Sequence, residues 1–231
     1  MIDMDRFVTA IIVAAGNSTR MGLGTSKQFI PLCGEPVIKH TLRAFEQSDI
    51  IDSVVVVCRP QDEGEIQKIV DENFKKVKAL VYGGAVRDES VRNGIVAADE
   101  RTTHYAIHDG ARPLIEQSDI TAVVEKAFET GAAALGTPVT DTIKVVDENN
   151  IIVDTPIRAQ LRAVQTPQVF EKSLYLKALD NAKDKSLNIT DDCKLVETLG
   201  ANVHIVIGSE TNIKLTTQSD ITLAETILKS R

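Results

Sequence analysis

The chain has 231 residues, 43% apolar and 26% charged, which suffices for one large domain or two small ones with a full hydrophobic core. A net charge of −7 argues against a protein that wraps duplex nucleic acid, and 4% aromatic residues with no Trp argue against a base-stacking platform. Three widely spaced cysteines without CxxC spacing argue against a disulfide framework or zinc site and favour a reducing cytoplasm.

Short β-branched runs alternate with helical patterns along the chain. The expected strands are residues 10–15, 53–58, 79–82, 105–108, 132–136 and 203–207. The expected helices are one opened by Pro36, then 62–71, 88–98, 118–129 with Ser118 as its cap, and 219–228. The apolar run near the N-terminus is too short for a signal peptide or a membrane span.

This alternation predicts an α/β fold, a three-layer arrangement around a mostly parallel sheet. In such sheets, ligands bind beyond the carboxyl ends of the strands.

One region breaks the alternation of strands and helices. Two strand-like runs, 142–146 and 151–155, flank the turn composition Asp-Glu-Asn-Asn, which predicts an inserted β-hairpin at about 138–165. Because an isolated hairpin is marginally stable, we expect it to pack on a dimer partner.

The first expected strand runs into a glycine-rich loop, AAGNSTRMGLGTSK, at residues 14–27. Small residues let backbone N–H groups approach a phosphate, and Arg20 and Lys27 can neutralise a triphosphate. The loop matches neither the Walker pattern nor the dinucleotide fingerprint, because Lys27 precedes Gln28 and no G-x-G-x-x-G is present. An ordinary loop with solvated charges is the alternative.

Two further loops follow expected strands. In GGAVRDES, the backbone of Gly83 and Gly84 with Ser90 suits a base edge, and Arg87 suits a phosphate; a turn capped by Asp88 is the alternative. In HDGARP, Asp109 suits Mg²⁺ or a sugar hydroxyl and Arg112 suits a phosphomonoester, whereas a surface turn is the alternative. His108 has no nucleophile beside it in sequence and is interpreted as structural.

A fourth group of polar residues is dispersed through the second half of the chain. Thr190 is expected to cap a helix that begins with Asp191-Asp192, and Lys214, between Ile213 and Leu215, is expected on the solvent side of a strand. The other members are Thr142, Lys144, Arg158, Gln165, Thr166, Pro167 and Gln168.

Taken in order, the motifs AAGNSTRMG, SKQF, YGGAVRDESVRNG, HDGARP, PVTDTIK, AVQTPQVF, TDD and NIKLT resemble the 2-C-methyl-D-erythritol 4-phosphate cytidylyltransferase family over about residues 9–228. The resemblance implies a single Rossmann-like nucleotidyltransferase domain over residues 1–231. It implies transfer of CMP from CTP to the sugar phosphate with release of pyrophosphate and a requirement for Mg²⁺. It also implies a cytoplasmic homodimer embraced through the hairpin arm.

The resemblance also implies residue roles. The CTP phosphates would lie on the first loop and the base and ribose on the second, with the contacts Ala14, Ala15, Gly16, Asn17, Ser18, Thr19, Gly83, Gly84, Arg87 and Ser90. The acceptor would contact Asp109, Arg112, Thr142, Thr166 and Thr190, with Asp109 as the metal ligand. The catalytic cations would be Arg20, Lys27, Arg158 and Lys214, with Thr142 and Arg158 acting in the neighbouring subunit's site.

The chain departs from the commonest family pattern at three places, namely the triplet Asn17-Ser18-Thr19, Arg162 and Thr211. They leave the fine substrate contacts open. A ribitol 5-phosphate cytidylyltransferase, which tends to read HDAVRP where this chain reads HDGARP, and a non-catalytic nucleotide-binding regulator remain alternatives. An NAD(P)-dependent oxidoreductase is disfavoured by the missing fingerprint.

The residues support this chemistry independently of the resemblance. No Ser-His-Asp or Cys-His set is evident, and an attacking phosphate needs none because it is already an anion. Two anions must approach one another in line, so fixed cations and a metal ion are the parts required.

Overall fold

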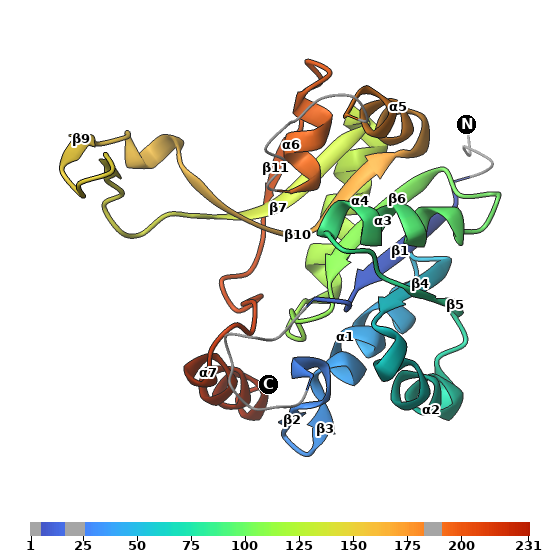
Figure 1. Cartoon of the computed structure of the whole chain (residues 1–231). Coiled ribbons are helices and arrows are strands. Elements are labelled where there is room, and N and C mark those ends of the chain that lie inside the picture. Colours follow the sequence, from blue (N-terminus) through green and yellow to red (C-terminus); the bar gives the residue numbers. More distant parts are fainter. Residues whose placement is uncertain (1–5, 17–25, 183–190) are drawn as a thin grey trace.

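The computed structural model describes residues 6–16, 26–182 and 191–231 (Figure 1). A seven-stranded sheet has the order β11-β7-β10-β6-β1-β4-β5. Its strands are β1 (Val8–Val13), β4 (Ser53–Cys58), β5 (Val77–Tyr82), β6 (His104–Asp109), β7 (Ala132–Pro138), β10 (Arg162–Glu171) and β11 (His204–Ile207). All neighbouring strands are parallel except β10, which runs antiparallel to β6 and β7. The predicted mostly parallel α/β sheet is confirmed.

Helices cover both faces of the sheet, as a three-layer fold requires. They are α1 (Val37–Glu46), α2 (Glu63–Asn73), α3 (Arg87–Val96), α4 (Gln117–Thr130), α5 (Lys172–Ala182), α6 (Asp192–Glu197) and α7 (Gln218–Lys229). Single 3₁₀ turns are η2 (Lys27–Phe29), η3 (Pro60–Asp62) and η4 (Arg158–Gln160), and short strand pairs are β2 (Pro31–Leu32) with β3 (Glu35–Pro36) and β8 (Val145–Val146) with β9 (Ile152–Asp154).

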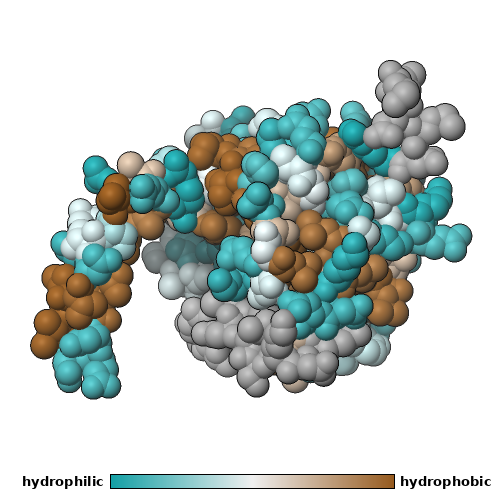
Figure 2. All heavy atoms as spheres, turned by 90° about the horizontal axis from the view of Figure 1, so that it is seen from above, coloured by the Kyte–Doolittle hydropathy of each residue, from teal (hydrophilic) through white to brown (hydrophobic). Residues whose placement is uncertain are grey.

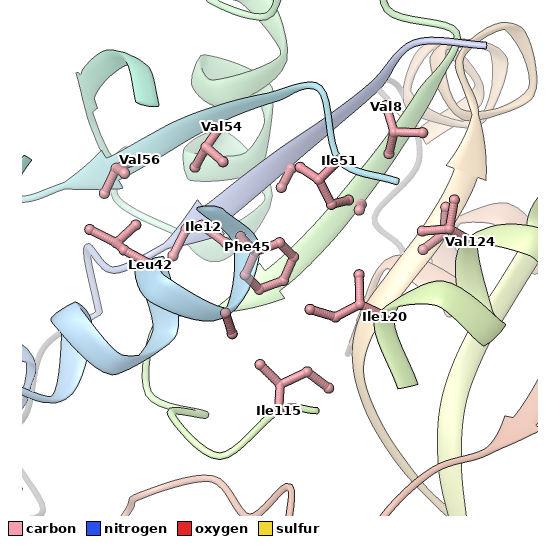
Figure 3. Close-up of a cluster of buried hydrophobic side chains, with 14 of the residues drawn as sticks. Val8, Ile12, Leu42, Phe45, Ile51, Val54, Val56, Ile115, Ile120 and Val124 are labelled. Carbon is pink, nitrogen blue, oxygen red and sulfur yellow. The ribbon is translucent and has the colours of Figure 1, made fainter. Parts of the chain in front are cut away.

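Alternate residues of each strand belong to two separate cores. Ile12 points into the core formed with α1, α2 and α4, where Phe45 and Ile120 are fully buried (Figure 3). Ile11 points to the opposite core, which is formed with α3, α5 and α6. Each fully buried side chain of this size contributes about 1.5–3 kcal/mol. The strands are therefore apolar at nearly every position because both of their faces are covered.

A third, smaller core lies under α7 and connects two parts of the chain. Ile30 and Leu32 follow η2, and Leu215 precedes α7; they pack together with Ile221 and Ala224 of that helix. In Figure 1, α7 lies beside β2 and β3. This core anchors the segment that follows Lys27 and the segment that contains Lys214.

Several sequence expectations need correction. The N-cap of α4 is Glu116, so Ser118 lies inside the first turn, and α3 begins after Val86 rather than at a cap formed by Asp88. Asp191 caps α6 through a side-chain bond from the Lys194 amide, while Thr190 lies outside the described residues. The helix α6 begins where a helix was expected, at Asp192, whereas the strand β10 and the helix α5 had no counterpart in the predicted elements.

The hairpin leaves the sheet after β7 and returns into β10. Its strands β8 and β9 pair Val146 with Ile152, and Asp147 and Asn150 form the turn. Figures 1 and 2 show this arm extending away from the body, with apolar side chains on its surface. The predicted hairpin is thus present, and residues 139–161 between β7 and β10 are defined here as the arm.

Candidate functional site

A cleft of about 430 Å³ opens at the carboxyl ends of β1, β4, β5 and β6. The chain proceeds from β1 through β4 to β5 on one side and then crosses to β6 on the other, so the cleft lies at the switch in strand order. Its lining comprises Val13, Ala15, Gly16, Lys27, Gln28, Cys58, Arg59, Pro60, Gln61, Gly83, Gly84, Ala85, Val86, Arg87, Ser90, Asp109, Ala111 and Lys214. Residues from all three loops singled out in the sequence therefore meet here.

The first loop leaves β1 at the centre of the cleft. Backbone bonds fix its start: the Ala14 amide donates to the Val57 carbonyl over 2.7 Å, and the Gly110 amide donates to the Val13 carbonyl over 2.9 Å. Ala15 and Gly16 line the cleft, and Ala14 is buried beneath them. Asn17, Ser18, Thr19 and Arg20 lie outside the described residues.

The glycine pair after β5 is required by close packing. A Cβ on Gly83 would lie 2.3 Å from the Ala15 Cβ and 2.9 Å from the Ser90 Oγ, and one on Gly84 would lie 2.2 Å from the Glu89 Cβ. Gly83 therefore lets the second loop approach the first, and Gly84 leaves room for the Glu89 side chain at the start of α3.

The backbone donors expected to be free in the second loop are engaged within the chain. The Gly83 amide donates to the Cys58 carbonyl, the Gly84 amide to Ser90 Oγ and the Ala85 amide to Glu89 Oε2. Because its hydroxyl accepts this bond and donates to the Val86 carbonyl, Ser90 braces the loop locally.

Asp109 ends β6 and gathers three cations. Its carboxylate lies 2.8 Å from the Lys214 ammonium, 3.7 Å from the Arg87 guanidinium and 3.9 Å from Arg112 Nε. Burial works to raise the pKa of Asp109, but Lys214, Arg87 and Arg112 outweigh it and lower that pKa to about 2. The carboxylate is therefore ionised at neutral pH, and the positive charges around it outnumber it.

The segment that carries Lys214 is hydrogen-bonded to the loop after β6. The Leu215 amide donates to the Ala111 carbonyl, and Arg112 Nη1 donates to the Asn212 carbonyl over 2.7 Å. Asn212 in turn donates from Nδ2 to the Gln165 side chain and to the Thr166 carbonyl. Lys214 was expected on a solvent-facing strand, but its segment is irregular and these bonds direct its ammonium to Asp109.

His108 and Thr166 support Asp109 from behind. Thr166 Oγ1 accepts a bond from the Asp109 amide and lies 3.1 Å from His108 Nδ1, while His108 Nε2 lies 3.2 Å from the Arg112 carbonyl. Burial lowers the pKa of the fully enclosed His108 to about 4. His108 is therefore neutral, and both of its ring nitrogens have hydrogen-bond partners behind the cleft, which agrees with the structural role expected for it.

Arg87 stands between two carboxylates. Its Nη1 donates to Asp192 Oδ2 over 2.5 Å, and its Nη2 faces Asp109. Burial works to lower the pKa of Arg87, but Asp192 and Asp109 outweigh it and raise that pKa. Arg87 is therefore a permanent cation on the wall of the cleft.

Other expected site residues lie apart from the cleft. Thr142 and Arg158 are on the arm, where Arg158 Nη1 donates to the Thr140 carbonyl. Arg112 and Thr166 support the cleft from beneath rather than line it. Thr190 falls outside the described residues. Within the described part of the chain, the cleft thus combines Lys27, Arg87, Asp109 and Lys214.

Sequence reasoning missed part of the cleft wall. Residues 58–61 are the last residue of β4 and the three that follow it, so the rule that ligands bind at the carboxyl ends of strands was the available signal. Gln28 is buried and donates to the Ala14 carbonyl, which no local pattern indicates. The pairing of Asp192 with Arg87 joins residues 105 positions apart, a distance that a single sequence does not bridge.

The donor set fits a magnesium ion only in combination with a substrate. Among the described residues, no group of three or more His, Cys, Asp or Glu side chains is placed to hold a metal. Mg²⁺ is commonly held by one or two carboxylates together with substrate phosphates and waters, and the ionised Asp109 supplies one such carboxylate. The described helices include none long and apolar enough to cross a membrane.

The cleft is built to bind anions rather than to supply a nucleophile. Cys58 lines it, but burial raises the pKa of its thiol to about 11, which keeps it protonated and unreactive. The cations Lys27, Arg87 and Lys214 line the cleft together with the small residues Ala15, Gly16, Gly83 and Gly84. This arrangement suits a phosphorylated ligand with a planar group.

The sequence model of the family described as 2-C-methyl-D-erythritol 4-phosphate cytidylyltransferase matches residues 8–230. Proteins of that name from Desulforamulus reducens and Pelotomaculum thermopropionicum are 42% and 44% identical to this chain, covering 97% and 99% of it and 97% and 96% of their own lengths. The crystal structure of 4-diphosphocytidyl-2C-methyl-D-erythritol synthase from Anaerococcus prevotii superimposes with a TM-score of 0.88 at 29% identity, covering 97% of each chain. That of 2-C-methyl-D-erythritol 4-phosphate cytidylyltransferase from Thermus thermophilus gives 0.77 at 32% identity, covering 97% of this chain and 99% of the other.

Proposed function

The chain belongs to the 2-C-methyl-D-erythritol 4-phosphate cytidylyltransferase family, and from that membership we propose how its cleft transfers CMP from CTP to the sugar phosphate. The products are 4-diphosphocytidyl-2-C-methyl-D-erythritol and pyrophosphate. The enzyme is a nucleotidyltransferase of the isoprenoid pathway.

In the proposed reaction, an oxygen of the acceptor phosphate attacks the α-phosphorus of CTP. The bond from that phosphorus to the oxygen bridging to the β-phosphate breaks, and pyrophosphate leaves with the electron pair. The attacking phosphate needs no general base, which agrees with a neutral, buried His108 and a protonated Cys58. The protein must instead neutralise and align two anions.

The gathering of Arg87 and Lys214 around the ionised Asp109, in a cleft that Lys27 also lines, carries this proposal. We assign the CTP phosphates to the loop that starts with Ala14, Ala15 and Gly16, and transition-state stabilisation to Lys27 together with Arg20. The base and ribose would lie against Gly83, Gly84, Arg87 and Ser90. Lys214 would hold the acceptor phosphate, with Asp109 and Thr190 completing its site and Arg112 and Thr166 supporting that site from beneath.

Asp109 is the residue we propose to hold Mg²⁺. When bound, the ion would neutralise phosphate charge and help align the two substrates. Asp109 is suited to this role because its carboxylate is ionised, with its pKa lowered to about 2, and faces the cleft.

We propose that the arm joins two copies of the chain into a homodimer. Its apolar side chains are exposed: Ile151 by 61%, Ile152 by 58%, Val153 by 60% and Ile157 by 65%. So much apolar surface on a projecting hairpin favours a covering partner. In the dimer, Thr142 and Arg158 would contribute to the neighbour's acceptor site.

The three free cysteines, Cys33, Cys58 and Cys193, support a cytoplasmic location.

Measuring pyrophosphate release by the purified protein, with CTP and each of two acceptors, tests the assignment. We expect turnover with 2-C-methyl-D-erythritol 4-phosphate to exceed that with ribitol 5-phosphate. Faster release with ribitol 5-phosphate would overturn the acceptor, and no release with either would overturn the activity. Replacing CTP by UTP in the same assay checks the nucleotide.

A further inference from the structure

A buried carboxylate lies behind the cleft and does not line it. Asp192 is the first residue of α6, is 3% exposed and is not among the residues that line the cleft. Its Oδ2 accepts the bond from Arg87 Nη1 over 2.5 Å, and its Oδ1 accepts a bond from the Tyr175 hydroxyl over 2.6 Å. Both oxygens of Asp192 therefore have fixed donors, one of which belongs to the cleft.

Tyr175 is held as firmly as the carboxylate that it contacts. Its side chain is fully buried, and its ring lies 5.1 Å from that of Phe170 and 6.3 Å from that of Tyr105, measured between centroids. Phe170 and Tyr105 belong to the central strands β10 and β6. Packing on these two rings therefore fixes the position of the Tyr175 hydroxyl relative to the sheet. A rigid line of contacts thus runs from the sheet through Tyr175 and Asp192 to Arg87.

Arg87 itself is placed to respond to this anchor. Its other nitrogen, Nη2, lies 3.7 Å from Asp109 Oδ1, whereas Lys214 occupies the other oxygen of that carboxylate at 2.8 Å. Arg112 is the third cation at Asp109, and of the three only Arg87 also forms an ion pair with a second carboxylate among the described residues.

We propose that Asp192, oriented by Tyr175, is a positioning residue that keeps Arg87 extended along the cleft wall and away from full pairing with Asp109. This inference deepens the proposed function and rests on it. Without the Asp192 charge, the nearest carboxylate for Arg87 is Asp109. A closer Arg87–Asp109 pair would compete with Lys214 for that carboxylate and withdraw Arg87 from the nucleotide, disturbing both substrate sites.

Asp192→Asn removes the charge with little change in size, and Tyr175→Phe removes only the hydrogen bond that orients the carboxylate. Each is made alone and in combination with Arg87→Gln, and kcat and KM are measured for both substrates. We expect each single variant to lower kcat/KM on the order of tenfold, and to have little further effect when Arg87 is already replaced.

Asp191→Asn is the matched control. Asp191 is the adjacent carboxylate; it caps α6 and accepts a bond from Gln168 Nε2, but does not contact Arg87. Asn is also an effective cap, so this variant should retain the wild-type kcat/KM. Thermal unfolding of every variant reports whether the fold is kept, and Tyr175→Phe carries the test if Asp192→Asn does not fold.

A merely structural role for Asp192 predicts equal losses with and without Arg87, and that result would overturn the inference. Unchanged kinetics of a folded Asp192→Asn or Tyr175→Phe variant would also overturn it. The wild-type protein in the same assay tests the proposed function separately: failure of wild-type CMP transfer would remove both, whereas normal transfer with additive losses removes the positioning role alone.

Discussion

The ammonium of Lys214 lies 2.8 Å from the carboxylate of Asp109, which joins the last irregular segment of the chain to the end of the central strand β6. Lys214 remains 41% exposed while Asp109 is only 14% exposed. The lysine therefore occupies the open side of the pair, where an incoming phosphate can reach it while Asp109 keeps it in place.

Replacing Lys214 by Met tests this arrangement. Met keeps the length of the side chain but removes the charge that we assign to the acceptor phosphate. We expect kcat/KM for the acceptor to fall by roughly a hundredfold, about 3 kcal/mol, with the fold retained because the site is partly exposed. Lys229→Met, in an exposed pair with Glu225 on α7, is the control. Equal kinetics of the two variants in a pyrophosphate-release assay would contradict the role.

Lys27→Ala examines the nucleotide side of the same cleft. Lys27 begins the turn η2 and lines the cleft, so its loss should lower turnover by about a hundredfold while circular dichroism and thermal unfolding stay close to wild type. Lys68→Ala removes an exposed lysine paired with Glu65 on α2 and should leave turnover unchanged. Near-normal turnover of Lys27→Ala would exclude this lysine from transition-state stabilisation.

The parallel part of the sheet was predictable, because strands such as β4, which is apolar at every position after Ser53, are covered on both faces. The strand β10 was not. Pro167 interrupts it, and the buried polar residues Gln165, Thr166 and Gln168 break its apolar pattern. Gln165 and Thr166 bond to Asn212 and to the Asp109 amide, so the needs of the site override the pattern of the strand there. Gln168 instead holds the start of α6 through Asp191 and the Cys193 amide.

The site was predictable as a set of loops but not as a network. Each loop shows its chemistry locally, such as the glycine pair followed by Arg87. Which carboxylate holds Arg87, and which segment delivers Lys214 to Asp109, depend on packing between distant elements. The small core beneath α7 supplies that packing for Lys214, and its residues look like any other apolar positions in the sequence.

Gly83→Ala tests the close approach of the first two loops. The added Cβ would lie 2.3 Å from the Ala15 Cβ, so one loop must move. We expect the affinity for CTP to fall and the free energy of unfolding to fall by about 1–3 kcal/mol. Gly64→Ala is the control, because a Cβ there meets nothing within 4 Å and lies in helix α2, where alanine is favoured. Titration calorimetry with CTP and urea unfolding measure the two effects, and unchanged CTP affinity of Gly83→Ala would argue against this contact.

The buried His108 should make stability depend on pH. Its pKa is lowered to about 4 in the folded protein, so between roughly pH 6.5 and 4 the unfolded chain binds a proton that the folded one does not. The free energy of unfolding must therefore decrease as the pH falls through this window. At pH 5 the contribution of His108 to this decrease is about 2 kcal/mol relative to neutral pH. His108→Asn should lose less stability than wild type between pH 7 and 5, whatever its stability at pH 7. Equal slopes for His108→Asn and the wild-type protein in urea titrations would contradict the assignment.

Charged residues on the arm should dissociate the proposed homodimer. Val146 and Ile152 face one another across β8 and β9 and are 46% and 58% exposed. Val146→Asp combined with Ile152→Asp places two like charges where apolar side chains would be covered by a partner, so the double variant should be monomeric by light scattering at micromolar concentration. Its KM for the acceptor should also rise, because Thr142 and Arg158 would no longer reach the neighbouring cleft.

Val96→Asp, at a position of α3 that is 87% exposed and remote from the arm, should leave both properties unchanged. A monomeric wild-type protein would rule out the arm as an interface, and a monomeric double variant with normal acceptor KM would show that each cleft is complete within its own chain.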